Sequence, residues 1–257
     1  MEQSISVMTA AIKEILTDNL LALYVYGSCT TADYQPGWSD IDILCLTKAE
    51  LSPPQAKALL NLRQTLTDFH PRPPCYRAFE GGFLTLKQLL NNAGGTVVYW
   101  GTSGQRITDS YCWDAFSRLQ LLDYGRLLTG KEVRGQIPRP ERKELHDAVV
   151  SHYETIREYA SQTGKSLYTA GWMLDIARCL YTLQTGGIIA KTEAGRWALR
   201  QKLAPDPAAM ERVLDIRTHP REALADDETM EWLAALTPAI HRFADVLEQQ
   251  IKNASAL

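Results

Sequence analysis

Several features that identify common protein classes are missing from this chain of 257 residues. No apolar run approaches the roughly 18 residues of a membrane helix. The N-terminal segment carries Glu2 and Lys13 in an amphipathic pattern, which is unlike a signal peptide. The five cysteines are scattered without Cys-x-x-Cys spacing, which argues against a zinc site and a disulfide framework. We therefore expect a cytoplasmic protein with reduced thiols and no membrane partner.

Signals of several functional classes are missing as well. The chain has no Gly-x-Ser-x-Gly element and no Walker loop, which weakens a hydrolase or kinase assignment. Its five histidines show no metal-binding spacing. The net charge of −3 supplies no general attraction to nucleic acid, although it is compatible with a cationic small molecule. With 45% hydrophobic and 22% charged residues, the composition is that of a globular protein with a full core.

The most informative segment is residues 20–46, in which two apolar runs flank a polar spacer. The first run, residues 20–26, ends in Gly27-Ser28, and Asp40-Ile41-Asp42 opens the second run. Both runs are short and rich in large apolar residues, which predicts two buried strands. Alternate side chains of a strand share a face, so Asp40 and Asp42 are expected to project side by side.

These residue types suit a metal–nucleotide site. Two adjacent carboxylates repel each other unless a cation lies between them, and oxygen ligands favour Mg²⁺. The turn at Gly27-Ser28 offers backbone N–H groups and a hydroxyl to phosphate oxygens. A lone Asp-x-Asp is usually a solvated edge or turn. The metal interpretation depends on the order, the spacing and both flanking strands together.

The remaining pattern predicts two domains. Helix over 3–17, strand, strand, helix over 53–68 and a third strand over 75–86, after a proline-rich break at 70–74, indicate an α+β domain with a mixed sheet. A second break at 135–140 precedes a region with almost no strand pattern. The helices expected there cover residues 141–162, 166–185, 191–202, 206–217 and 228–252. We place the domains at 1–138 and 139–257.

A third carboxylate is expected from another strand, and Glu80 is the candidate because it lies in the middle of the predicted third strand. It would serve as a metal ligand or as the base that takes the proton of an acceptor hydroxyl. The alternative is an exposed strand glutamate. Gly81-Gly82 directly after it weakens a regular strand but allows a ligand to approach the backbone.

The Gly27-Ser28 turn followed by Asp40-Ile41-Asp42 resembles the motif of the polymerase-β-type nucleotidyltransferase superfamily. Within it, Arg77-Ala78-Phe79-Glu80 and residues 178–198 resemble the adenylyltransferases that modify streptomycin and spectinomycin. The resemblance implies a mixed-sheet nucleotidyltransferase domain followed by an all-α helical-bundle domain. It also implies Mg²⁺ as cofactor and ATP as co-substrate. Glu80 would be the base, and Ser39 would contact the nucleotide.

The same resemblance assigns residues in the second domain. Arg178 and Lys191, thirteen positions apart, match an arginine and a lysine that bind the ATP phosphates. Taken singly, each could equally be a cation in solvent. Trp100 matches a tryptophan that stacks on the drug, with a half-buried aromatic at the domain edge as the alternative. The stretch 165–168 lacks the acidic residues with which streptomycin-modifying relatives bind the drug.

We therefore expect a Mg²⁺-dependent nucleotidyltransferase that transfers AMP from ATP to a hydroxyl of a small, cationic molecule and releases pyrophosphate. The favoured acceptor is an aminoglycoside. Modification of aminoglycosides is an activity of antibiotic-resistance enzymes. One alternative is a catalytically silent or regulatory nucleotide-binding module of the same superfamily. Another is an RNA-tailing enzyme, which would need a basic stripe that the balanced charge does not indicate. The sequence leaves the acceptor, the nucleotide preference and the oligomeric state open.

Overall fold

The computed structural model describes residues 1–70, 74–91, 93–102, 104–111 and 113–255. The chain divides into two compact units. The first comprises Met1–Ala32 and Asp40–Arg139, and the second comprises Asp33–Ser39 and Pro140–Leu257. The change of unit after Arg139 falls next to the break expected near residue 138. The short segment Asp33–Ser39 differs from the expectation, because it belongs to the second unit although it lies within the first in sequence.

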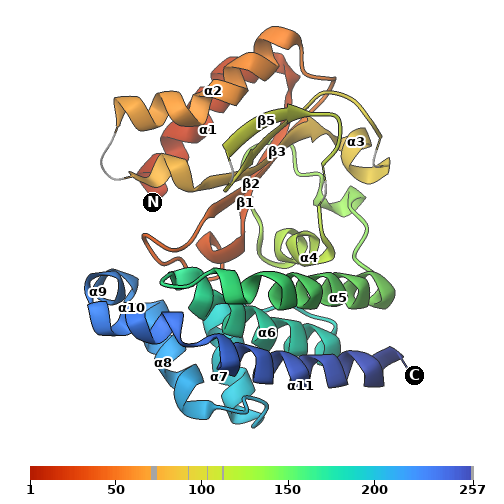
Figure 1. Cartoon of the computed structure of the whole chain (residues 1–257). Coiled ribbons are helices and arrows are strands. Elements are labelled where there is room, and N and C mark those ends of the chain that lie inside the picture. Colours follow the sequence, from red (N-terminus) through yellow and green to blue (C-terminus); the bar gives the residue numbers. More distant parts are fainter. Residues whose placement is uncertain (71–73, 92, 103, 112, 256–257) are drawn as a thin grey trace. The chain divides into compact units, whose positions relative to one another are not determined.

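The first unit is built on a six-stranded mixed sheet with the order β5-β4-β3-β2-β1-β6 (Figure 1). Strands β2 and β3 are parallel, and the other neighbouring pairs are antiparallel. Its elements are α1 (Glu2–Leu16), β1 (Leu20–Tyr26), β2 (Ile41–Thr47), α2 (Pro53–Phe69), β3 (Phe79–Thr85), α3 (Leu86–Asn91), β4 (Val97–Gly101), β5 (Gly104–Thr108), α4 (Ala115–Tyr124) and β6 (Arg126–Gly130). The predicted α+β class is confirmed.

Alternation along the strands gives the sheet two apolar faces. Leu44, Leu46 and Leu84 lie on one face in a cluster that includes Leu121 of α4. Ile41 and Ile43 are fully buried and, by alternation, point to the opposite face, the side on which Figure 1 shows α1 and α2. Both faces of the central strands are therefore covered, and the ends of β2 and β3 are left to carry polar groups.

Local signals explain where α2 begins. Ser52 accepts a hydrogen bond from the backbone N–H of Gln55, and the Gln55 side chain accepts one from the backbone N–H of Ser52. This capping box precedes Pro53 and Pro54, whose missing N–H groups are not needed in a first turn. The helix expected over 53–68 starts at the observed first residue, Pro53, and stops one residue before the observed last residue, Phe69.

The third strand is shorter than expected. Residues 74–78 form a 3₁₀ turn, and β3 begins only at Phe79, so Glu80 is the second residue of the strand and not its middle. The ring of Tyr76 stacks on that of Phe79 and is buried, which favours the compact turn over an extended chain. Residues 71–73 of the predicted proline-rich break lie outside the described residues.

Among its described residues, the second unit contains helices and loops but no strand, as predicted. Its helices are α5 (Arg142–Tyr159), α6 (Leu167–Thr185), α7 (Lys191–Arg200), α8 (Pro207–Thr218), α9 (Pro220–Ala225), α10 (Asp227–Ala234) and α11 (Thr237–Ser255). Helix α6 packs on α5, α7, α8 and α11 and supplies many of the buried side chains. The prediction of a single helix over 228–252 is wrong. This stretch is divided between α10 and α11, because Pro238 lacks the N–H that a continuous helix would need.

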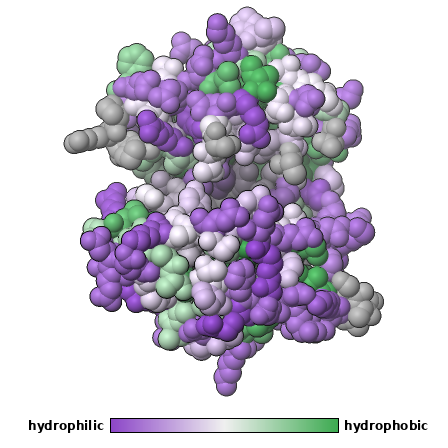
Figure 2. All heavy atoms as spheres, in the orientation of Figure 1, coloured by the Kyte–Doolittle hydropathy of each residue, from purple (hydrophilic) through white to green (hydrophobic). Residues whose placement is uncertain are grey.

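Hydrophilic side chains dominate the face drawn in Figure 2, and apolar ones form only small groups there. The described part of the chain contains no helix that is both long and apolar enough to cross a membrane. None of its four cysteines forms a disulfide, and Cys112 lies outside the described residues. Most large apolar residues are buried in the cores of the two units. The polar groups described next lie on the helices, strands and turns that these cores support.

Candidate active site

The turn after β1 brings the chain close to β2. Gly27 has a left-handed backbone with φ of +70°, and a Cβ there would lie 2.1 Å from Oδ2 of Asp42. Only glycine combines this conformation with so close an approach to a carboxylate. The glycine of the sequence motif is therefore required by the geometry beside Asp42.

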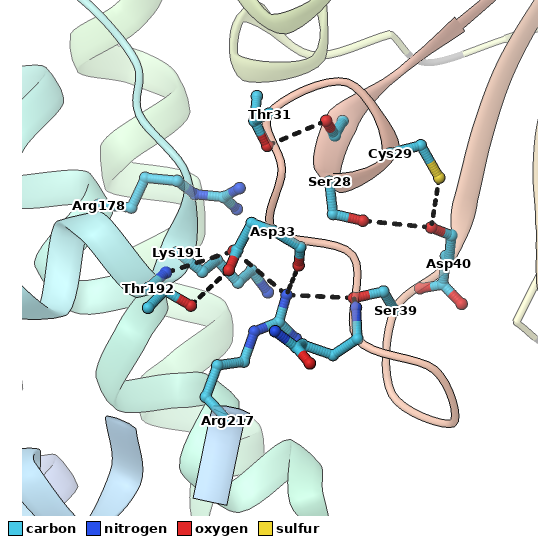
Figure 3. Close-up of polar contacts among 12 residues, drawn as sticks. Ser28, Cys29, Thr31, Asp33, Ser39, Asp40, Arg178, Lys191, Thr192 and Arg217 are labelled. Carbon is cyan, nitrogen blue, oxygen red and sulfur yellow. Dashed lines mark hydrogen bonds and ion pairs between the residues drawn. The ribbon is translucent and has the colours of Figure 1, made fainter. Parts of the chain in front are cut away.

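Hydroxyl and thiol groups organise the turn further. The hydroxyls of Thr30 and Thr31 donate to the carbonyl of Gly27, at 3.0 and 3.3 Å. The Ser28 hydroxyl donates to the Asp40 carbonyl at 3.4 Å, and the Cys29 Sγ lies 3.9 Å from the same oxygen (Figure 3). Burial, followed by the charge of Asp42, raises the pKa of Cys29 to about 12, so this thiol stays protonated.

Parallel pairing of β2 and β3 places two of the predicted carboxylates side by side. Asp42 and Glu80 are register partners, so their Cα atoms are about 4.8 Å apart and their side chains leave the same face of the sheet. Asp40 directly precedes β2, and the intervening Ile41 is fully buried. The register thus brings Asp42 and Glu80 together at the start of the strands, with Asp40 next to them in the chain.

The donor set of this strand end suits a hard cation that shares its ligands with a substrate. Among the residues that the structure describes, no three His, Cys, Asp or Glu side chains converge closely enough to hold a metal ion by themselves. Mg²⁺ is commonly bound by only one or two carboxylates together with substrate phosphates. One or two of the carboxylates of Asp40, Asp42 and Glu80 would therefore suffice for a Mg²⁺ ion that arrives with a nucleotide.

Two residues that the sequence analysis missed support Glu80. The hydroxyl of Thr102 donates to the Glu80 carboxylate at 2.7 Å, which orients it. The buried Arg63 of α2 donates to the carbonyl groups of Phe79 and Gly101, at 2.9 and 3.1 Å. Burial lowers the pKa of Arg63, and the charge of Glu80 is the strongest influence opposing this shift. The Arg63 guanidinium thus places a positive charge next to strands β3 and β4. In the sequence Arg63 looks like an ordinary helix arginine.

The assignment of Trp100 to the acceptor site is wrong for this structure. Trp100 is fully buried, its indole N–H donates to the carbonyl of Leu59 at 3.0 Å, and its ring meets that of Phe83 edge to face. On β4 its side chain points to the opposite face from that of Tyr99. A side chain with no exposed surface cannot stack on a substrate, so Trp100 is part of the core.

We expect Trp100→Phe to reduce the free energy of unfolding by about 1–3 kcal/mol, because a smaller ring replaces the indole and leaves the Leu59 carbonyl without its donor. The KM for the acceptor should stay within about twofold of the wild-type value. Thermal denaturation and steady-state kinetics measured in parallel test this. A large rise in KM at unchanged stability would restore Trp100 to the substrate site.

In the second unit, one carboxylate holds both predicted phosphate-binding cations. Asp175 of α6 accepts from Arg178 at 2.8 Å and from Lys191 at 3.0 Å, all three from neighbouring helices α6 and α7. Burial alone would raise the pKa of Asp175, but Lys191 and then Arg178 outweigh it and hold that pKa below its ordinary value. Arg178 and Lys191 therefore lie beside the same carboxylate, as the family resemblance implied. Asp175 is the counter-ion of both cations.

A second cluster, not foreseen from the sequence, surrounds Ser39 in the same unit (Figure 3). Arg217 of α8 donates to the Ser39 hydroxyl at 3.1 Å and to the backbone carbonyl of Asp33 at 3.0 Å. It also forms an ion pair with the Asp33 carboxylate at 3.3 Å. The Thr192 hydroxyl and backbone N–H donate to that carboxylate as well. Ser39 is thus buried and held by a residue 178 positions further along the chain.

Two family models match consecutive parts of the chain. The model of a nucleotidyltransferase domain matches residues 10–88, and that of the aminoglycoside adenylyltransferase C-terminal domain matches residues 135–249. Among curated protein sequences, no significant match was found. The two matches correspond to the predicted order of a nucleotidyltransferase domain followed by a helical one.

A solved structure shares the fold over nearly the whole chain. It is spectinomycin adenyltransferase AAD(9) from Enterococcus faecialis, crystallised with ATP and spectinomycin. The alignment has 14% sequence identity and a TM-score of 0.65, and it covers 96% of this chain and 99% of that one. At this identity the likeness establishes the shared fold, whereas the family models carry the assignment. The chain is an enzyme that belongs to the aminoglycoside adenylyltransferase-like nucleotidyltransferases.

Proposed function

We propose that this enzyme transfers AMP from ATP to a hydroxyl of a small molecule, with an aminoglycoside antibiotic as the favoured acceptor, and releases pyrophosphate. The observation that carries the proposal is the parallel register of Asp42 and Glu80 beside the glycine turn at Gly27. It gathers carboxylates next to backbone and hydroxyl groups that suit phosphate oxygens. ATP and spectinomycin in the structural relative support the choice of co-substrate and of acceptor class.

In the proposed reaction each residue has a separate task. Asp40 and Asp42 hold Mg²⁺, which supplies charge stabilisation at the phosphate oxygens when it is bound. Glu80, oriented by the hydroxyl of Thr102, accepts the proton of the acceptor hydroxyl as that oxygen attacks the α-phosphorus. Ser28 presents its hydroxyl at the turn after β1. The leaving pyrophosphate carries away the electron pair of the broken P–O bond.

The cations of the second unit are proposed to bind the phosphates. Asp175 holds Arg178 and Lys191 beside each other, so little side-chain ordering would remain when they bind a triphosphate. Their charges would favour the triphosphate and then the departing pyrophosphate. Because Asp175 neutralises part of this charge, it would lower the attraction of the two cations to any anion.

The test is a screen for pyrophosphate release. Each nucleoside triphosphate is combined with Mg²⁺ and with members of the aminoglycoside class, including streptomycin and spectinomycin, and the product is identified by mass spectrometry. We expect release that needs both ATP and an acceptor, with one AMP added to the acceptor. ATP binding without turnover on any acceptor would favour the regulatory module, and extension of an RNA primer would favour the tailing enzyme.

Glu80→Gln should lower kcat by at least about 100-fold while the Kd for ATP changes less than about threefold, because the amide keeps the shape but cannot take a proton. Calorimetric titration with ATP–Mg²⁺ and single-turnover kinetics separate the two effects. Glu14→Gln, an exposed substitution on α1, is the control and should match the wild type. Loss of ATP binding in Glu80→Gln would instead make this carboxylate an essential metal ligand.

A further inference from the structure

The segment Asp33–Ser39 is held by the helical unit through one buried ion pair. The side chains of Arg217 and Asp33 are only 3% and 7% exposed. The guanidinium also lies 4.8 Å from the ring centroid of Trp38, within the same segment. Arg217 therefore contacts the first residue, the last residue and the aromatic ring of this segment, and it fixes the segment at several points.

The Asp33 carboxylate also completes the start of α7. The N-cap residue of this helix, Ala190, has no side chain that could accept a hydrogen bond. Asp33 takes over that task, because its carboxylate accepts from the backbone N–H of Thr192 at 3.3 Å and from the Thr192 hydroxyl. A carboxylate at a helix N-terminus is also favoured by the helix dipole. Lys191, the first residue of α7, is thus placed by a residue of the loop between β1 and β2.

This arrangement is costly if its only purpose is stability. Nε of Arg217 is buried and has no hydrogen-bond partner among the described residues, so the guanidinium is incompletely satisfied. Burial lowers the pKa of Arg217, and the charge of Asp33 is the main influence that opposes it. A well-packed apolar pair often stabilises a fold as well as a buried ion pair does. The cluster therefore suits a role in which exact placement matters more than the energy gained.

We propose that Asp33 and Arg217 are positioning residues for adenylyl transfer. Arg217 fixes the position of Ser39, which directly precedes Asp40 in the chain. Asp33 fixes the start of α7, which begins at Lys191, through the hydrogen bonds from Thr192. Within the second unit, one ion pair thus fixes both the segment that ends next to Asp40 in the chain and the start of the helix that carries Lys191. This inference rests on the proposed function, since it assigns the pair to the same nucleotide site.

The main variants are Asp33→Asn, which removes the charge but keeps the shape, and Arg217→Lys, which keeps the charge but loses the planar fork. Hydrogen exchange of the ligand-free protein should become at least about tenfold faster in residues 33–40, because the segment opens more often. In kinetic assays we expect the KM for ATP to rise by about 10- to 100-fold, as for a lost charge-assisted contact, with a fall in kcat as well.

A milder pair of variants guards against misfolding. Thr192→Val removes the hydroxyl that donates to Asp33 at nearly constant volume, and Thr192→Ser keeps that hydroxyl. We expect the valine variant to shift KM and exchange by about threefold in the same direction, and the serine variant to stay within about twofold of the wild type. If Asp33→Asn does not fold, this pair decides the question.

Asp206→Asn is the matched control, because Asp206 likewise caps a helix of this unit and pairs with an arginine, Arg242. It should lower the melting temperature slightly and leave KM, kcat and the exchange of residues 33–40 unchanged. Variants of Asp33 and Arg217 that behave like this control would overturn the positioning role alone. A wild-type protein that does not bind ATP would overturn the proposed function and this inference together.

Discussion

Replacing Asp42 with asparagine is expected to lower adenylyl transfer by at least about 100-fold. Asparagine keeps the size of the side chain but removes the charge that would hold Mg²⁺. Because Asp42 lies beside Glu80 in the parallel register, the substitution also relieves repulsion between two carboxylates in the free protein. Stability should therefore be unchanged or slightly higher.

The measurement combines kcat at saturating ATP, a Mg²⁺ titration and thermal denaturation. Asp40→Asn should behave in the same way, since Asp40 directly precedes the strand that carries Asp42. Asp18→Asn, an exposed substitution ahead of β1, is the control for charge alone and should leave activity intact. Retention of more than about a tenth of wild-type turnover in either active-site variant would show that the metal assignment is wrong.

Replacing Arg178 with alanine is expected to weaken ATP binding by about 10- to 100-fold, which corresponds to a lost charge-assisted contact of roughly 1.5–3 kcal/mol. Lys191→Ala should act in the same direction. The loss of ATP affinity in the double variant should differ from the product of the two single losses. The two effects are coupled because both cations share Asp175 as a neighbour and the triphosphate as a ligand.

Calorimetric titration of the full chain with ATP–Mg²⁺ measures these effects directly. Arg200→Ala is a matched control, since Arg200 is an exposed arginine of α7 that pairs with Glu193. It should bind ATP as the wild type does. Undiminished ATP affinity in Arg178→Ala and Lys191→Ala would show that the second unit does not bind the phosphates, and the proposed role of these cations would fall.

Features encoded by neighbouring residues could be predicted from the sequence. The apolar runs of β1 and β2 and the start of α2 depend on contacts within one strand or one helix. The pairing of Arg178 with Lys191 was implied by the family resemblance and depends on one pair of helices. The grouping of Asp42 with Glu80 required only that two predicted strands be neighbours. Two of the predicted carboxylates could therefore be expected to lie side by side, as the register shows.

The supporting residues could not be predicted, because their partners are distant in sequence. Arg63 looks like any polar position on a helix until β3 and β4 bring the carbonyl groups of Phe79 and Gly101 to it. Arg217 and Asp33 are 184 positions apart and follow no local pattern. Trp100 shows the opposite error, since an aromatic residue in an apolar strand gives no sign of which face it occupies until the sheet order is known.

The assignment of Asp33–Ser39 to the helical unit has a consequence for how the protein is made and dissected. On the ribosome this segment emerges long before α7 and α8, so its contacts can form only near the end of synthesis. A fragment spanning 140–257 alone would bury Arg217 without its carboxylate and would leave α7 without its cap. Domain-by-domain expression would therefore separate the helical half from seven residues that complete its core.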